Sequence, residues 1–105
     1  MAFAENLKQL PGIENIERLE LIDEDGTVVA IIENKPGQSG SLAVYNHLVQ
    51  KYYAINASAA MEGLTLFAEH TNSAEQNPGK HPNIDRLFRV IEENSSLAAR
   101  IHSRP

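Results

Sequence analysis

Hydrophobic residues at the start of the chain are spaced as on one side of a helix. Phe3, Leu7 and Leu10 recur at intervals of three and four residues, which is helical spacing. Pro11 and Gly12 follow directly, and both residues end helices. This pattern predicts one short helix ahead of the first strand.

A β-hairpin is predicted next. Leu19–Ile22 is rich in apolar residues, and Thr27–Ile32 is rich in β-branched residues, which suit a pleated strand. Between the two segments, Asp25 and Gly26 supply the positive φ that a tight hairpin turn needs. The second strand is apolar almost throughout, which indicates a central strand or one covered on both faces.

Three longer helices are predicted after the hairpin. The first begins at Ser39 or at the serine two residues later, either of which can cap it. The second runs from about residue 57 to residue 70 and is capped by Asn56 or Ser58. The third opens near Pro82, because proline is favoured at the first position of a helix. Their apolar residues recur with a helical period: Leu42, Tyr45, Leu48, Val49 and Tyr52; Ala60, Met61, Leu64, Phe67 and Ala68; Ile84, Leu87, Phe88 and Ile91.

The remaining segments complete an α+β pattern in the order α-β-β-α-α-α-β. Residues 71–80 form a polar loop, and residues 97–102 form a third strand that joins the hairpin. Strands that come together in the sequence, followed by helices, favour a small, mostly antiparallel sheet with three main helices packed on one face. Residues 1–105 are expected to form a single domain, since this length is typical of one.

Composition narrows the classes of partner. The formal net charge is −5, and no three Lys or Arg residues fall together, so nucleic acid and anionic membrane surfaces are disfavoured. The chain has no cysteine and no secretory signal at its start, which favours a cytoplasmic protein. The apolar runs are too short to span a bilayer.

One candidate binding site combines the glycine-rich turn of residues 33–41 with the predicted helix start at residues 80–85. Free N–H groups at a helix start attract anions, and a lysine accompanies each of the two segments. A glycine turn with a serine cap is the alternative interpretation, because the nucleotide-binding glycine motifs are absent. The candidate ligand-binding residues are Lys35, Gly37, Ser39, Gly40, Ser41 and Lys80.

A second candidate site is a metal centre formed by His70, His81 and Asp85. Two imidazoles and one carboxylate can hold a divalent ion, if the loop before the last helix folds back. The spacing matches no zinc motif, however. Helix termini also explain two of these residues without a metal. A cation is favoured at a helix C-terminus, where His70 is expected, and an anion is favoured in a first turn, where Asp85 is expected.

Self-association is a further candidate property. Three strands leave two exposed sheet edges, and such edges pair with other chains unless they are blocked. Tyr45, Tyr52 and Tyr53 could add aromatic interface surface, or they could lie in the core of a monomer. A homodimer is therefore one of the expected states.

Two long segments resemble an uncharacterised family of small bacterial proteins, a domain of unknown function. They are residues 32–52 (IENKPGQSGSLAVYNHLVQKY) and residues 66–87 (LFAEHTNSAEQNPGKHPNIDRL), and the opening FAENLKQLPGIENIERLELIDEDG is similar too. The resemblance implies a bacterial cytoplasmic protein. It supplies no activity, cofactor or functional residue.

The sequence leaves the activity unknown and favours a non-catalytic binding or interaction module over an enzyme. None of its serines lies in a nucleophile motif, and no cofactor motif is present. A protein, a small anion or a second copy of the chain is the expected partner. The alternative is anion binding or a metal-assisted activity where the Gly37–Ser41 turn meets the His81–Asp85 helix start.

Overall fold

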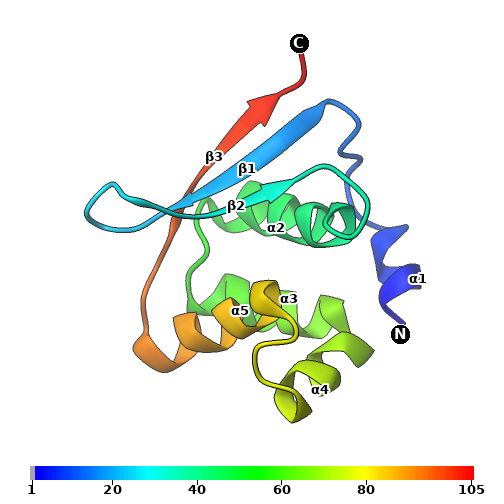
Figure 1. Cartoon of the computed structure of the whole chain (residues 1–105), viewed down its shortest axis with the longest axis vertical. Helices are drawn as coiled ribbons and strands as arrows, with labels where there is room; N and C mark the ends of the chain where they lie inside the picture. The colour runs from blue at the N-terminus through cyan, green and yellow to red at the C-terminus, as the bar shows by residue number, and fades with distance from the viewer. Residues whose placement is uncertain (1) are drawn as a thin grey trace.

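A computed structural model describes residues 2–105 of the chain (Figure 1). Within this part, five helices and three strands follow one another. They are α1 (Phe3–Leu7), β1 (Ile16–Ile22), β2 (Val28–Glu33), α2 (Ser39–Tyr52), α3 (Ala57–Phe67), α4 (Glu69–Gln76), α5 (Pro82–Glu93) and β3 (Ala98–Ser103). The fold is α+β, and its elements follow the predicted order with one helix, α4, added.

The strands form an antiparallel sheet in the order β2-β1-β3, so the C-terminal strand lies beside the first strand of the hairpin. Leu19 of β1 and Ile32 of β2 point to the helix-covered face, and both are almost fully buried. Alternate residues point to the open face. There, Glu20 Oε1 accepts hydrogen bonds from Arg100 Nη1 (3.1 Å) and His102 Nε2 (2.9 Å), and the bond from His102 is the main cause that lowers the pKa of Glu20.

β2 is an edge strand with one open face, so the expectation that it is central or doubly covered is wrong. Val28 and Ile31 are 41% and 51% exposed. The reason is that β3 pairs with β1 and leaves β2 outside. Local hydrophobicity does not reveal a pairing between segments so far apart in the chain.

The outer edge of β2 is partly blocked. The pairing register with β1 shifts between Leu21 and Ile22, which is the mark of a bulge. Near the other end of the strand, the Glu33 N–H donates to Oε1 of Gln38 (3.0 Å). Bulges and side-chain partners shorten the edge that another chain could use. Dimerisation through this edge therefore stays a prediction.

The helices cover the other face of the sheet in two layers. Helix α2 packs against β1 and β2, and α3 and α5 pack together on the far side of α2 (Figure 1). The core lies between these layers, and its largest fully buried side chains are Tyr45, Leu19, Leu21, Ile32, Leu42, Leu48, Ile55, Leu87 and Val44.

The segment predicted as a helix to residue 70 and a loop over residues 71–80 is divided differently. Helix α3 ends at Phe67, and Ala68 takes φ 52° and ψ −116°. Helix α4 then occupies most of the expected loop. Its start is fixed by the Thr71 hydroxyl, which donates to the Leu64 carbonyl, and by Ala74, which is buried. Tertiary contacts therefore override the weak helix propensity of this polar stretch.

The predicted helix caps are confirmed in one case and wrong in another. The Asn56 side chain accepts the Ala59 N–H at 2.9 Å, as expected for a cap of α3. Helix α2 begins at Ser39, but it has no side-chain cap, and neither Ser39 nor Ser41 supplies one. The residue at the capping position is Gln38, whose side chain is bound to β2 instead.

Gly63 allows three helices to approach closely. It is buried in the middle of α3, between α2 and α5. A Cβ atom at this position would lie 2.8 Å from Leu87 Cδ1 and 2.9 Å from Leu48 Cδ1. Real Cβ atoms almost never approach other atoms so closely, so an alanine here would force the ends of the Leu48 and Leu87 side chains to shift within the packed core.

We therefore expect Gly63→Ala to lower the free energy of unfolding by about 1 kcal/mol. Overpacking costs about 1–3 kcal/mol, and the better helix propensity of alanine returns up to about 1 kcal/mol. Urea denaturation followed by circular dichroism measures the change. Ser58→Ala, at an exposed position of the same helix, is the control and should not destabilise. A Gly63→Ala variant as stable as the wild type would contradict this account of the packing.

Candidate functional site

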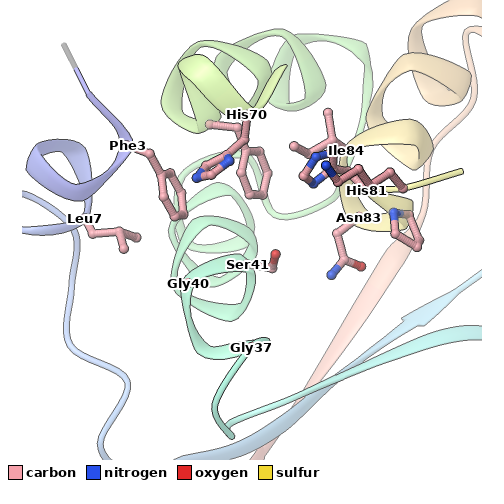
Figure 2. A pocket seen from close by; sticks show the side chains of 12 residues that line it. Phe3, Leu7, Gly37, Gly40, Ser41, His70, His81, Asn83 and Ile84 are labelled. Carbon is pink, nitrogen blue, oxygen red and sulfur yellow. The ribbon is translucent and has the colours of Figure 1, made fainter. Parts of the chain in front are cut away.

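A cavity of about 450 Å³ lies where four segments meet. These are α1, the start of α2, the junction of α3 and α4, and the segment that enters α5 (Figure 2). Its lining consists of Phe3, Leu7, Gly37, Gly40, Ser41, Phe67, His70, Lys80, His81, Pro82, Asn83 and Ile84. The volume lies in the range of small-molecule sites.

The start of α2 presents unsatisfied N–H groups to this cavity. The first N–H of the helix that finds a helical acceptor is that of Leu42, which donates to the Gln38 carbonyl at 2.9 Å. Because the helix has no side-chain cap, the N–H groups of Gly40 and Ser41 have no acceptor among the described residues. N–H groups point toward the start of their helix, so the positive end of the α2 dipole faces the cavity.

The start of α5 faces the same cavity and is also uncapped. His81 occupies the capping position but makes no capping hydrogen bond, and Pro82 follows at the first helical position. Proline has no N–H, so Asn83 supplies the first N–H of this helix. Two helix starts from distant parts of the sequence therefore meet at one hollow, as Figure 2 shows for Ser41 and Asn83.

Two imidazoles line the cavity: the His70 ring lies beside the Phe3 ring, and the His81 ring lies near the start of α5 (Figure 2). The ring centroids of His70 and His81 are 5.9 Å apart. His70 is held edge-on against the Phe3 ring, with centroids 4.9 Å apart. His81 Nε2 shares a hydrogen bond of 3.1 Å with Ser73 Oγ. Each ring therefore has a fixed position while part of its surface lines the cavity.

The other wall of the cavity is apolar and is built by α1. The Phe3 ring stacks on the Phe67 ring with centroids 5.5 Å apart. The Phe3 N–H donates to Glu69 Oε1 at 2.8 Å, and this bond is the main cause that lowers the pKa of Glu69. Asn6 Nδ2 donates to the Leu66 carbonyl at 3.0 Å. These contacts hold a helix of only five residues in place.

The backbone at Ala68 aims two lining residues into the cavity. With φ 52° and ψ −116°, Ala68 takes a conformation that glycine adopts readily and alanine rarely. The reversal lies between Phe67 and His70, and both side chains line the cavity. Strained backbone of this kind is often found at binding sites.

The structure gathers most of the predicted ligand-binding residues. Gly37, Gly40, Ser41 and Lys80 line the cavity, as do the two histidines of the metal hypothesis. Two predicted members lie outside the lining. Lys35 Nζ pairs with Glu33 Oε2 at 2.7 Å, and the Ser39 N–H donates to the Lys35 carbonyl.

The structure does not assemble the hypothetical metal centre of His70, His81 and Asp85 in the described part of the chain. Asp85 accepts the Gly79 N–H at 2.9 Å and does not line the cavity of His70 and His81. Among residues 2–105, no three His, Cys, Asp or Glu side chains are gathered as metal ligands would be. The reason is that His70 opens α4 rather than closing α3, while Asp85 turns back onto the loop before α5.

Some lining residues were not expected from the sequence. Phe3, Leu7 and Phe67 belong to helical apolar stripes, which predict core positions and do not distinguish a buried side chain from one that lines a hollow. Asn83 follows the proline at the start of α5. Its position next to a predicted helix start was the one available signal.

A second polar cluster, missed from the sequence, joins α2 to α3. Glu62 of α3 accepts hydrogen bonds from Lys51 Nζ (2.7 Å) and Tyr52 Oη (2.7 Å), and pairs with His47 Nε2 (2.5 Å). The bond from Lys51 is the largest cause that lowers the pKa of Glu62 to about 2, and Tyr52 and His47 contribute against the opposing effect of burial. In turn, Glu62 raises the pKa of Lys51 and of Tyr52.

The fold and the cavity define a small α+β protein with a ligand-sized hollow between helix starts. Residues 3–101 match the model of a family described as an uncharacterized protein conserved in bacteria, DUF2322, and the chain belongs to this family. No curated protein and no solved structure shows significant similarity to the chain. No helix within residues 2–105 has the length and apolar content needed to cross a membrane.

We expect Ala68→Gly to raise the free energy of unfolding by about 1 kcal/mol. A non-glycine residue in this conformation costs about 1–3 kcal/mol, and part of the gain is offset by the greater freedom of glycine in the unfolded chain. Thermal unfolding measures the change. Ala43→Gly, inside α2, is the matched control and should lose about 1 kcal/mol. If both variants lose stability to the same extent, Ala68 is not strained.

The cluster around Glu62 predicts a specific loss of stability in acid. Because folding lowers the pKa of Glu62 from 4.5 to about 2, its contribution is complete above pH 4.5 and is lost as the pH falls toward 2. Glu62→Gln should cost about 1–2 kcal/mol at neutral pH, since the cluster is partly solvated, and should flatten the pH dependence in this window. Urea denaturation at several pH values tests this. Glu24→Gln, in the exposed hairpin turn, should keep the wild-type slope.

Proposed function

We propose that this protein is a non-catalytic binding protein for a small organic anion, a carboxylate or phosphate ester with an apolar part. The anionic group would lie against the uncapped starts of α2 and α5 and near Lys80. The apolar part would lie against Phe3 and Phe67. Because the sequence contains no cysteine and so does not depend on an oxidising compartment, we infer that the protein works in the cytoplasm.

The observation that supports this proposal best is the convergence of positive groups on one cavity of an acidic protein. The chain carries a net charge of −5. The cavity nevertheless receives two helix starts, the Lys80 side chain and two imidazoles, and no carboxylate is among its lining residues. Helix N-termini bind carboxylates and phosphates through their N–H groups, and a lysine adds charge.

The remaining lining residues support an organic ligand rather than a bare inorganic ion. One wall is made by the rings of Phe3 and Phe67 and by the aliphatic side chain of Leu7. An inorganic phosphate would leave this wall in contact with water. A ligand with an apolar or aromatic group would remove that apolar area from water, which contributes roughly 25 cal/mol per Å².

The contacts of His81 support binding rather than nucleophilic catalysis. Ser73, which shares a hydrogen bond with His81, lies in the middle of α4 and is not part of the cavity lining. Its hydroxyl therefore fixes the imidazole and does not face a bound molecule. The N–H groups of the two helix starts, Lys80 and the apolar wall are suited to hold an organic anion.

Titration with phenyl phosphate and with inorganic phosphate, followed by NMR chemical shifts, tests this function. We expect phenyl phosphate to bind more tightly and to shift the amide signals of Gly40, Ser41 and Asn83. Lys80→Met should weaken phenyl phosphate about ten-fold, as expected for one exposed charge-assisted hydrogen bond. Lys35→Met is the matched control, because Lys35 also precedes a helix start but lies outside the cavity lining.

A separate variant tests the role of the apolar wall. Phe3→Ala should weaken phenyl phosphate and leave the affinity for inorganic phosphate almost unchanged. Equal losses in Lys80→Met and Lys35→Met would show attraction by overall charge only. Amide shifts spread over the surface would contradict the assignment of the cavity.

A further inference from the structure

A second hollow, a groove of about 680 Å³, runs between α4 and α5. It shares no lining residue with the cavity described above, and the short segment of residues 78–80 separates the two. The groove is lined by Ala74, Glu75, Pro78, Gly79, Asp85, Phe88, Arg89, Ile91 and Glu92.

The floor of the groove is apolar. Phe88 and Ile91 of α5 are only partly buried, although both pack against the core. Ala74 of α4 and Pro78 of the following loop complete the apolar surface. The part of α5 that lines the groove runs from Asp85 to Glu92, a length of roughly 10 Å, or two helical turns.

The rim of the groove is acidic. Glu75 lies on the side of α4, and Asp85 and Glu92 lie on the side of α5. Arg89 is the one basic residue among the lining residues. An apolar floor between carboxylates matches a helix that has apolar residues on one face and lysines or arginines beside them.

We propose that this groove docks a cationic amphipathic helix from a partner protein. Two apolar side chains of the partner, spaced by three or four residues, would contact Phe88 and Ile91. Its basic residues would pair with Glu75 and Glu92, which are both exposed.

Charge decides between this partner and the other candidates for the groove. Groove-to-groove pairing with a second copy of the chain would bring three carboxylates and one arginine against the same set, so like charges would outnumber opposite ones. An anionic lipid surface or a nucleic acid would be repelled by the same rim. A basic protein segment is the partner for which both the floor and the rim are favourable.

A synthetic helix with leucines at helical spacing and lysines elsewhere, of roughly 15 residues, is the probe. Isothermal titration at low salt should show binding, and a peptide with glutamates in place of lysines should not bind. NMR chemical-shift changes should fall on α4 and α5. The double variant Glu75→Lys/Glu92→Lys should weaken the binding of the lysine peptide about ten-fold, since both exposed ion pairs are lost.

Controls separate docking from attraction by net charge and from misfolding. Glu14→Lys/Glu24→Lys changes the net charge equally at two exposed positions outside the groove, and should bind almost as the wild type does. Equal weakening by both double variants would overturn the proposal, and so would shift changes outside α4 and α5. Binding to anionic vesicles in place of the peptide, or a dimer that the groove variant dissociates, would also overturn it. Phenyl phosphate binding to the cavity is measured on the same variants. The proposal for the groove and the proposal for the cavity can therefore be confirmed or refuted independently.

Discussion

The arrangement depends on one buried tyrosine that ties α2 to the start of α5. Tyr45 is fully buried in the middle of the fold, and its hydroxyl donates to the Asn83 carbonyl at 2.5 Å. The same oxygen accepts a hydrogen bond from Arg86 Nη1 at 3.1 Å, and Arg86 also donates to Asn83 Oδ1 at 2.8 Å. Burial is the main cause that raises the pKa of Tyr45 to about 12, so the hydroxyl stays a donor at any physiological pH. Since Asn83 lies in the first turn of α5, this contact places that helix start beside the start of α2.

The cavity follows from this constraint together with the loss of the helix caps. A serine cap at Ser39 or Ser41 would have satisfied the first N–H groups of α2 and added roughly 1 kcal/mol to stability. Instead, Gln38 occupies the capping position and uses its side chain to hold β2. The uncapped ends, together with the positive φ of Ala68, are local costs that the packed core tolerates. The two uncapped helix starts and Ala68 all lie at the same cavity. This cavity, and not another surface, is therefore the candidate site.

The sequence could predict the elements that depend on local pattern. Helical spacing of apolar residues was sufficient for α2 and α5, and β-branched residues beside an Asp-Gly turn were sufficient for the hairpin. Asn56, one of the two caps expected for α3, is the one observed. Features that depend on distant contacts were not predictable. The pairing of β3 with β1 exposes β2, and a tertiary hydrogen bond from Thr71 to Leu64 converts an expected loop into α4. Tyr45, which could have lain on the surface as easily as in the core, is buried, whereas Tyr53 is 86% exposed.

The candidate site was predictable to the same extent and for the same reason. Two glycine-rich or proline-rich helix starts can be recognised in a sequence, but their meeting depends on how α5 crosses α2. Gly79 and Lys80 are neighbours in the chain, yet they line different hollows. Gly79 lies in the groove, where its N–H donates to Asp85, and Lys80 lies at the cavity. The fold thus separates positive groups from negative ones on two sides of a single short segment. The ligands proposed for the two hollows are therefore of opposite charge, a difference that the net charge of −5 for the whole chain does not reveal.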